Sequence, residues 1–106
     1  MSFVHHKTNG KKLGAKLLFE GEDYSVYVIN EKEGKVIPNH MHSHWDESWY
    51  IINGLYSITI EGKNVFAYPG DFITVERNTR HSIRCASDNA TRLAIFKKDV
   101  GIEYED

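Results

Sequence analysis

Three histidines and one glutamate stand close together in the first half of the chain. The histidines occupy alternate positions, His40, His42 and His44, and Glu47 follows them. Side chains two residues apart in a β-strand point to the same face, so His40 and His42 are expected to project together, about 6.6 Å apart along the backbone. Two imidazoles and a carboxylate suit Mn, Fe, Co, Ni, Cu or Zn. The pattern predicts a site for one divalent transition metal ion, whose identity it leaves open.

Glu47 is separated from His42 by an odd number of positions. The two residues are five apart, which is the wrong parity for one continuous strand. A turn within Ser43–Asp46 is therefore expected, with Glu47 on the next strand and facing back toward the histidines. The alternative interpretation is a chance cluster of loop histidines that binds no metal.

The strand signals around this cluster are short and evenly spaced. Runs rich in β-branched and aromatic residues predict strands at Ser25–Ile29, Val36–His42, Trp49–Ile52, Tyr56–Ile60, Val65–Tyr68, Phe72–Val75, His81–Cys85 and Arg92–Lys97. Turn signals separate them at Asn53–Gly54, Glu61–Asn64, Pro69–Gly70 and Ala86–Asn89. No segment has a helical period over ten or more residues. The pattern is typical of an all-β sandwich or barrel.

Length and composition limit the classes of protein to consider. A chain of 106 residues suits a single domain, 1–106, with residues 1–15 as a short N-terminal arm or, alternatively, an extra edge strand. The net charge of −2 gives no electrostatic case for nucleic acid. The single cysteine fits a reducing compartment. No apolar run approaches the roughly 20 residues that span a bilayer, and no signal peptide is evident. A cytoplasmic protein without a membrane partner is expected.

Two spaced motifs resemble those of the cupin superfamily. The first motif, 34–54, agrees at every named position: Gly34, His40, His42, Glu47 and Gly54. The second motif, 70–85, opens at Gly70, and His81 falls where its histidine is expected. Glu76, Asn78 and Cys85 replace the proline, glycine and asparagine of that second motif. The change at Asn78 is mild, because asparagine can adopt the left-handed backbone of a turn glycine.

The resemblance implies a fold, a ligand set and an assembly. The fold would be a double-stranded β-helix, the cupin or jelly-roll barrel, made of two antiparallel sheets. The metal would be held by His40, His42, Glu47 and His81, with open coordination positions for water, substrate or dioxygen. Many small cupins form homodimers through N-terminal strands, and the apolar run Leu17–Phe19 is consistent with such a dimer.

Three alternative functions are consistent with the predicted fold and ligand set. The first is a metalloenzyme that acts on a small molecule by dioxygenation, isomerisation or decarboxylation, an oxidoreductase in the first case. The second is a non-catalytic module that binds or senses a small ligand. The third is a structural or storage role, against which the short chain and the full ligand set argue. The fold does not decide among them, and the catalytic residues and the substrate remain unknown.

Other residues have a functional and a structural interpretation. His44 is either a group that supports the ligands or a solvated loop histidine. Trp49 and Ile51 share the parity of Glu47, so they line the ligand pocket or pack the core. Cys85 shares the parity of His81 and should point inward, as a thiol near the pocket or as a small buried apolar group. Four arginines are candidates for binding an anionic substrate, and most of them are interpreted as ordinary surface charges: Arg77, Arg80, Arg84 and Arg92.

Overall fold

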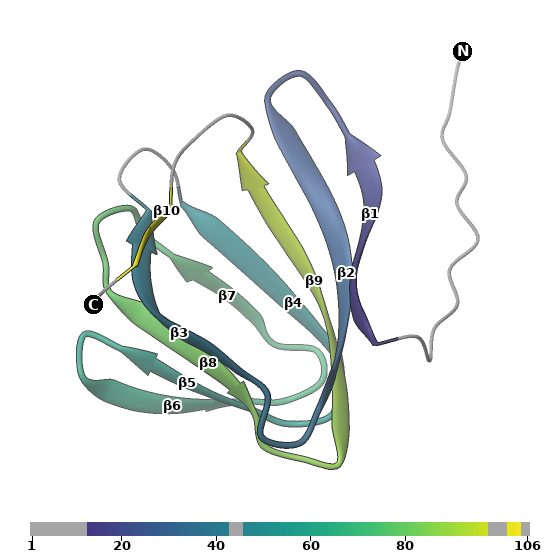
Figure 1. Ribbon diagram of the computed structural model, residues 1–106, viewed down its shortest axis with the longest axis vertical. Coiled ribbons are helices and arrows are strands. Elements are labelled where there is room, and N and C mark those ends of the chain that lie inside the picture. The colour runs from purple at the N-terminus through teal and green to yellow at the C-terminus, as the bar shows by residue number, and fades with distance from the viewer. Residues whose placement is uncertain (1–12, 43–45, 98–101, 105–106) are drawn as a thin grey trace.

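The predicted strands are present in the computed structural model, which describes residues 13–42, 46–97 and 102–104. The described residues form ten strands in two antiparallel five-stranded sheets (Figure 1). In the first sheet the order is β1 (Gly14–Glu20), β2 (Tyr24–Lys32), β9 (Asn89–Lys97), β4 (Glu47–Asn53) and β7 (Phe72–Val75). In the second it is β10 (Ile102–Tyr104), β3 (Val36–His42), β8 (His81–Cys85), β5 (Tyr56–Ile60) and β6 (Lys63–Ala67).

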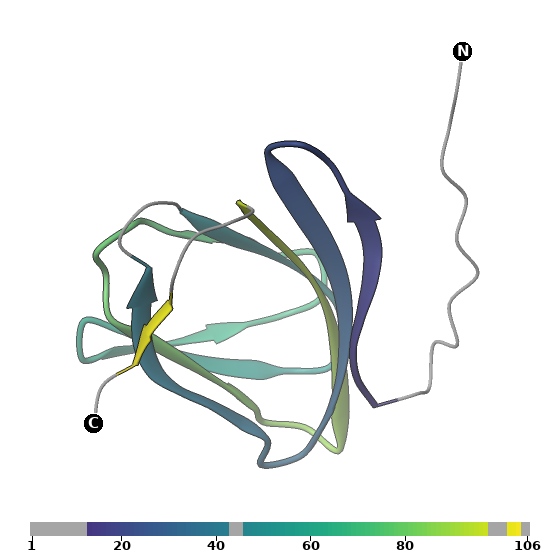
Figure 2. The ribbon, with the colours of Figure 1, turned by 45° about the horizontal axis from the view of Figure 1, so that its top comes forward.

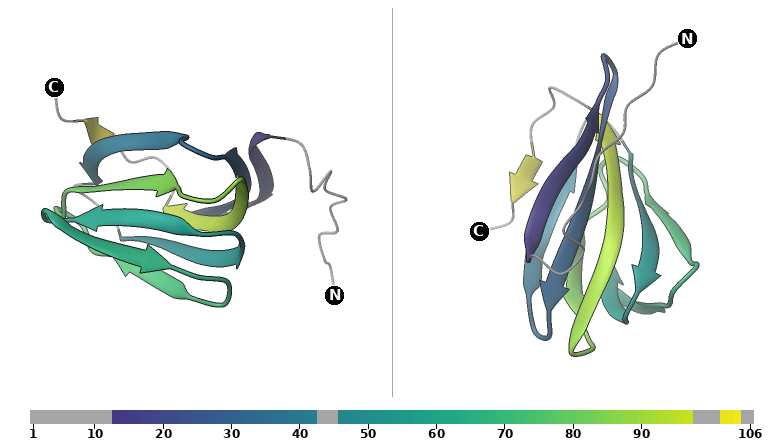
Figure 3. Two further views of the ribbon diagram at one scale, coloured as in Figure 1. Left: turned by 90° about the horizontal axis from the view of Figure 1, so that it is seen from below. Right: turned by 90° about the vertical axis from the view of Figure 1, so that its right-hand side faces the viewer.

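The chain crosses repeatedly between the two sheets. From β2 onward each connection changes sheet, except the hairpin between β5 and β6. This winding produces the double-stranded β-helix, and the two sheets face each other as layers in Figures 2 and 3. The expected fold class is therefore confirmed. Within the described residues no helix is long and apolar enough to cross a membrane.

The inner faces of the two sheets form the core. Alternate residues of β4 and β5 point inward, so Trp49, Ile51, Tyr56 and Ile58 are almost fully buried. Ile83 and Cys85 of β8 and Val75 of β7 complete this layer from the other strands. Burial of large apolar side chains on both inner faces holds the sheets together and leaves the polar inner positions as special cases.

Three turns have residues with positive φ values that place neighbouring strands. Between β5 and β6, Glu61 and Gly62 both have positive φ values, +49° and +78°, as a two-residue hairpin turn of this hand requires. Gly54, after β4, has φ +80°, and a Cβ built there would lie 2.4 Å from the Cβ of Ala90. Asn78 has φ +62°, the left-handed conformation expected from the second motif.

The strand boundaries differ from the predicted ones both at sheet edges and in the interior strands β2, β4 and β9, which are longer than predicted. Residues 14 and 15, expected in an N-terminal arm, belong to the edge strand β1, while residues 1–12 of that arm lie outside the described part. The strand β10, which pairs with β3, was not expected. The turn predicted over Glu61–Asn64 is shorter, because Lys63 and Asn64 already pair with β5. Asn89, predicted as loop, begins β9 and pairs with Lys32.

Candidate metal centre

Three of the predicted ligand residues converge inside the barrel. His40 on β3, Glu47 on β4 and His81 on β8 each offer a ligand atom, and these atoms all lie within 4.8 Å of one another. All three residues are buried, with His81 at 0% exposure. His40 and His81 are paired across β3 and β8, and their ring centroids are 4.2 Å apart. Glu47 Oε1 lies 3.6 Å from His81 Nε2. The cluster thus draws on both sheets.

Backbone carbonyls fix the orientation of both imidazoles. Nδ1 of His40 lies 2.7 Å from the carbonyl oxygen of Pro38, and Nδ1 of His81 lies 2.9 Å from that of Thr79. A carbonyl only accepts, so Nδ1 is the donor in both contacts, and Nε2 of each ring is the nitrogen that can bind a metal ion. Ring nitrogens held this way are the usual arrangement of metal-bound histidines. The donor set therefore fits a divalent transition metal ion.

Trp49 connects Glu47 to the barrel interior. Its indole Nε1 donates a hydrogen bond of 2.8 Å to Glu47 Oε2, which leaves Oε1 on the side of His81. The Trp49 ring also packs edge-on against the His81 ring, with 5.6 Å between centroids. Trp49 is 1% exposed, so this contact is shielded from water. The indole fixes the direction in which the carboxylate points.

A surface contact anchors the chain just before Glu47. Asp46 Oδ1 accepts the backbone N–H of Arg77 at 2.9 Å, with the Arg77 guanidinium Nε at 3.5 Å. The backbone hydrogen bond from Arg77 lowers the pKa of Asp46, and the positive charge of Arg77 adds to this effect. The contact ties the segment between β7 and β8 to the start of β4. It therefore holds the segment that leads into His81 beside the residue that precedes Glu47.

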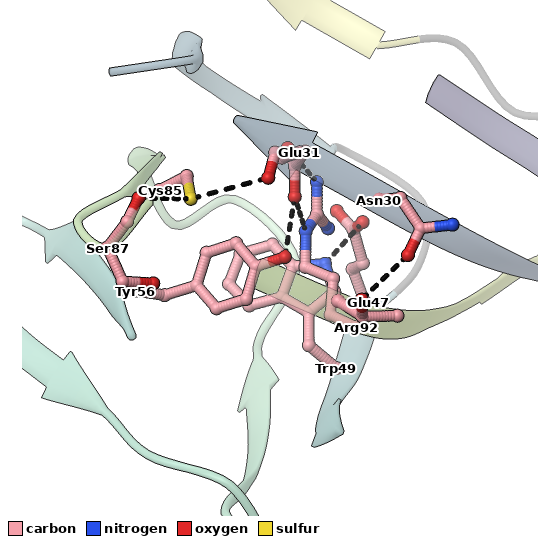
Figure 4. Close-up of polar contacts among 9 residues, drawn as sticks. Asn30, Glu31, Glu47, Trp49, Tyr56, Cys85, Ser87 and Arg92 are labelled. Carbon is pink, nitrogen blue, oxygen red and sulfur yellow. Dashed lines mark hydrogen bonds and ion pairs between the residues drawn. The ribbon is translucent and has the colours of Figure 1, made fainter. Parts of the chain in front are cut away.

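A buried ion pair lies on the other side of Trp49 (Figure 4). Arg92 of β9 donates from Nε to Glu31 Oε1 at 3.0 Å and from Nη2 to Oε2 at 3.3 Å. The Tyr56 hydroxyl donates to Glu31 Oε1 at 2.7 Å. Burial, and then the adjacent Glu31 carboxylate, raise the pKa of Tyr56, so the phenol stays protonated. The Arg92 guanidinium carbon lies 5.4 Å from the centre of the Trp49 ring.

Arg92 is not one of the ordinary surface charges that most of the four arginines were expected to be. Its exposure is 3%, and its bidentate partner Glu31 is 4% exposed. Sequence reasoning also missed Glu31 and the role of Tyr56 as its hydrogen-bond donor. A usable signal was present in β9, where Ala90 and Ala94 flank Arg92 on the same face. Two small side chains leave room there for one long one.

The other residues that the sequence singled out lie at different distances from the candidate metal centre or outside the described residues. Ile51 is buried with Trp49, and whether either contacts a ligand stays a prediction. Cys85 lies at the other end of β8 from His81, about 13 Å away by strand rise. Its buried thiol is 3.4 Å from the carbonyl oxygen of Ser87 and 3.6 Å from that of Glu31. The side chain of His42 and the whole of His44 lie outside the described residues.

Comparisons with known proteins agree with this architecture. Residues 27–96 match the family model described as the cupin domain. A curated relative, quercetin 2,3-dioxygenase of Bacillus subtilis (strain 168), is 34% identical over 76 residues, which are 72% of this chain and 22% of that protein. The chain thus spans about a fifth of the length of that relative.

Two solved structures illustrate the likeness of fold. KdgF from Halomonas sp. superposes with a TM-score of 0.75 at 20% identity, covering 80% of this chain and 77% of that one. An RmlC-like cupin family protein with a double-stranded β-helix fold, from Methanocaldococcus jannaschii, gives 0.75 at 21% identity, covering 90% and 88%. At such identities the likeness concerns the fold alone.

Proposed function

This chain belongs to the cupin domain family, and we propose that it is a metalloenzyme that acts on a small molecule at a site on His40, His42, Glu47 and His81. The observation that carries the proposal is the convergence of three buried ligand atoms from His40, Glu47 and His81 within 4.8 Å. Buried ionisable groups rarely gather without a charge to bind, because their isolation from water is costly. A divalent cation is the charge that this donor set fits.

Each described residue has a distinct part in the proposed site. Nε2 of His40 and of His81, together with Glu47 Oε1, would hold the ion, and the carbonyls of Pro38 and Thr79 keep both rings in the required tautomer. Trp49 orients Glu47 and excludes water from one side of the cluster. We propose His42 as the fourth ligand, since it is two residues from His40 on β3.

Dioxygenation is the reaction class that we favour. The similarity in sequence to a protein named quercetin 2,3-dioxygenase supports this choice over isomerisation or decarboxylation. A bound transition metal of this kind supplies Lewis-acid polarisation or activation of dioxygen. In a dioxygenation both oxygen atoms enter the organic product, so the reaction needs no reductant besides the substrate.

Metal content tests the site directly. Protein freed of metal by a chelator and reloaded with Mn, Fe, Co, Ni, Cu or Zn should retain a single equivalent after desalting. His81→Ala should lose most of this metal, since one of the ligands is gone, whereas Arg84→Ala, an exposed position on the same strand, should retain it. Elemental analysis measures the stoichiometry, and thermal unfolding checks that both variants are folded. Equal metal in the wild type and His81→Ala would contradict the proposed site.

Oxygen uptake tests the reaction class. The metal-loaded protein is given quercetin, the compound in the name of its relative, and then other small phenols, and dissolved oxygen is followed with an electrode. We expect uptake that depends on metal and is lost in His81→Ala. A compound that stabilises the loaded protein against heat without turnover, aerobically or anaerobically, would instead indicate a non-catalytic binding module. Turnover without oxygen uptake would indicate isomerisation or decarboxylation.

A further inference from the structure

A cavity of about 630 Å³ lies between the two sheets, beside strands β1, β2 and β3. Its volume is within the range of about 300–1,000 Å³ that is usual for small-molecule sites. Apolar side chains of Ala15, Ile29 and Ile37 form much of its wall. None of the residues that line it belongs to the cluster of His40, Glu47 and His81. The cavity is therefore distinct from the candidate metal centre.

The buried guanidinium of Arg92 provides the polar part of this cavity. Arg92 lines the cavity at 3% exposure, and its Nε and Nη2 are directed to Glu31. Both oxygens of Glu31 are occupied, one by Arg92 and Tyr56 and the other by Arg92 alone. Among the described residues, Nη1 of Arg92 has no hydrogen-bond partner. A donor pair on a buried guanidinium thus remains available to a ligand (Figure 4).

The charges around the cavity favour an anion. Lys32 and Lys35 line it together with Arg92, so three cationic residues and one carboxylate, that of Glu31, surround it. A planar guanidinium edge matches a carboxylate. The apolar walls favour a ligand with an apolar body, which an inorganic anion such as phosphate lacks. Carboxylate and hydrocarbon are the two features that the cavity recognises together.

We propose that this cavity is a second binding site, for a small organic monocarboxylate with an apolar body. The carboxylate lies against Nη1 of Arg92, with Lys32 and Lys35 contributing longer-range attraction, and the apolar body lies against Ile29 and Ile37. The Trp49 ring separates this site from the metal centre, since it lies 5.4 Å from the Arg92 guanidinium and 5.6 Å from the His81 ring. Binding at this site requires no metal.

The first test is a titration of the metal-free protein with benzoate and hexanoate, followed by amide chemical shifts in NMR. We expect saturable shifts at Ala15, Ile29 and Ile37, and none of comparable size with the neutral analogue benzyl alcohol. Lys32→Gln combined with Lys35→Gln should weaken binding by about 2- to 30-fold, the range that two exposed charges supply. Equal shifts with benzyl alcohol would overturn the assignment of an anion.

A variant that fills the cavity gives a matched comparison. Ala15→Trp places a large ring on the face of β1 that Ile29 shares, and should abolish binding. Lys16→Trp adds the same ring one residue along, on the opposite face beside Val28, and should leave binding intact. Both positions are exposed on an edge strand, so both variants should fold. Absence of saturable shifts with either carboxylate, or shifts at His81 that appear only after metal loading, would overturn the proposal.

Discussion

Trp49 links two of the candidate ligands, Glu47 and His81, to the rest of the barrel interior. Its indole nitrogen donates to Glu47, and its ring lies between His81 on one side and Arg92 on the other. A partner of a metal ligand contributes to affinity because it fixes the ligand's orientation before the ion arrives. The hydrogen bond to Glu47 therefore predicts an effect on metal binding that is separate from packing.

Replacement of Trp49 by Phe should lower metal affinity while preserving the fold. The change removes the indole N–H and retains an aromatic ring in the core. Loss of such a partner typically lowers metal affinity by about 10- to 100-fold. Competition with a chromophoric chelator measures the affinity, and Tyr50→Phe, the next residue and on the outer face of β4, is the control. An unchanged affinity in Trp49→Phe would show that the hydrogen bond does not position the carboxylate.

Removing Glu31 and Arg92 together should destabilise the protein much less than removing either residue alone. Glu31→Ala leaves an uncompensated buried guanidinium, and breaking such a pair costs about 3–5 kcal/mol of the free energy of unfolding. Glu31→Leu combined with Arg92→Met replaces both charges with apolar groups and should cost less than either single change. Urea unfolding of the single and double variants gives the coupling energy. Additive losses would mean that the pair is not electrostatically coupled.

The sequence identifies the candidate ligand residues better than the groups that support them. His40 and Glu47 are marked by type and spacing, because imidazole and carboxylate are common ligands of transition metals, and His81 is marked by its position in the second cupin motif. Arg92 carries no such mark, since an arginine on a strand is ordinarily at the surface. Its burial depends on Glu31, which is 61 residues away in the chain. Such a pairing depends on the register between strands, so the local sequence pattern around either residue does not predict it.

At the scale of elements, Gly54 and Gly62 have the same backbone conformation in different surroundings. Their φ values are +80° and +78°, but a Cβ would meet Ala90 at 2.4 Å in Gly54 and nothing within 4 Å in Gly62. Gly62→Ala should therefore destabilise by about 1 kcal/mol, the cost of a left-handed alanine. Gly54→Ala should destabilise by more, because β9 must also move. Denaturant unfolding compares them, and equal losses would contradict the steric contribution.

Strand prediction succeeds where the side chains on the two faces of a strand form a recognisable apolar or alternating pattern. β3, β5, β7 and β8 have the predicted boundaries, since apolar runs or alternating side chains end at turn residues there. β10 has only three residues, too few for a periodic pattern. β1 is an edge strand with mainly exposed side chains, so its sequence resembles that of an arm. β10 forms because it pairs with β3, and β1 forms because it pairs with β2; the composition of neither segment predicts a strand.

At the scale of the whole molecule, the candidate metal centre joins the two sheets. His40 and His81 belong to one sheet and Glu47 to the other, so an ion held by all three would link them across the core. A ligand bound only by the native state, at 100 times its dissociation constant, stabilises that state by about 2.7 kcal/mol. For a domain of about 100 residues this corresponds to a rise of roughly 10–20 °C in Tm.

The predicted rise in Tm can be measured by calorimetry with and without the metal that the protein retains. His81→Ala provides the control, because it should show little response to the same concentration of metal. A rise of equal size in the variant would indicate binding elsewhere on the surface. No rise in the wild type at saturating metal would indicate that the ion does not hold the sheets together.

The position of β9 has a consequence for synthesis on the ribosome. β9 lies between β2 and β4 in its sheet, yet it follows both in the chain. Until Asn89–Lys97 has left the exit tunnel, β2 and β4 have no strand between them, and Glu31 lacks Arg92. Nascent chains with unpaired strand edges are prone to associate with one another. A pause that holds the nascent chain on the ribosome before Asn89–Lys97 has emerged should therefore lower the yield of soluble protein, whereas a pause after this segment has emerged should not.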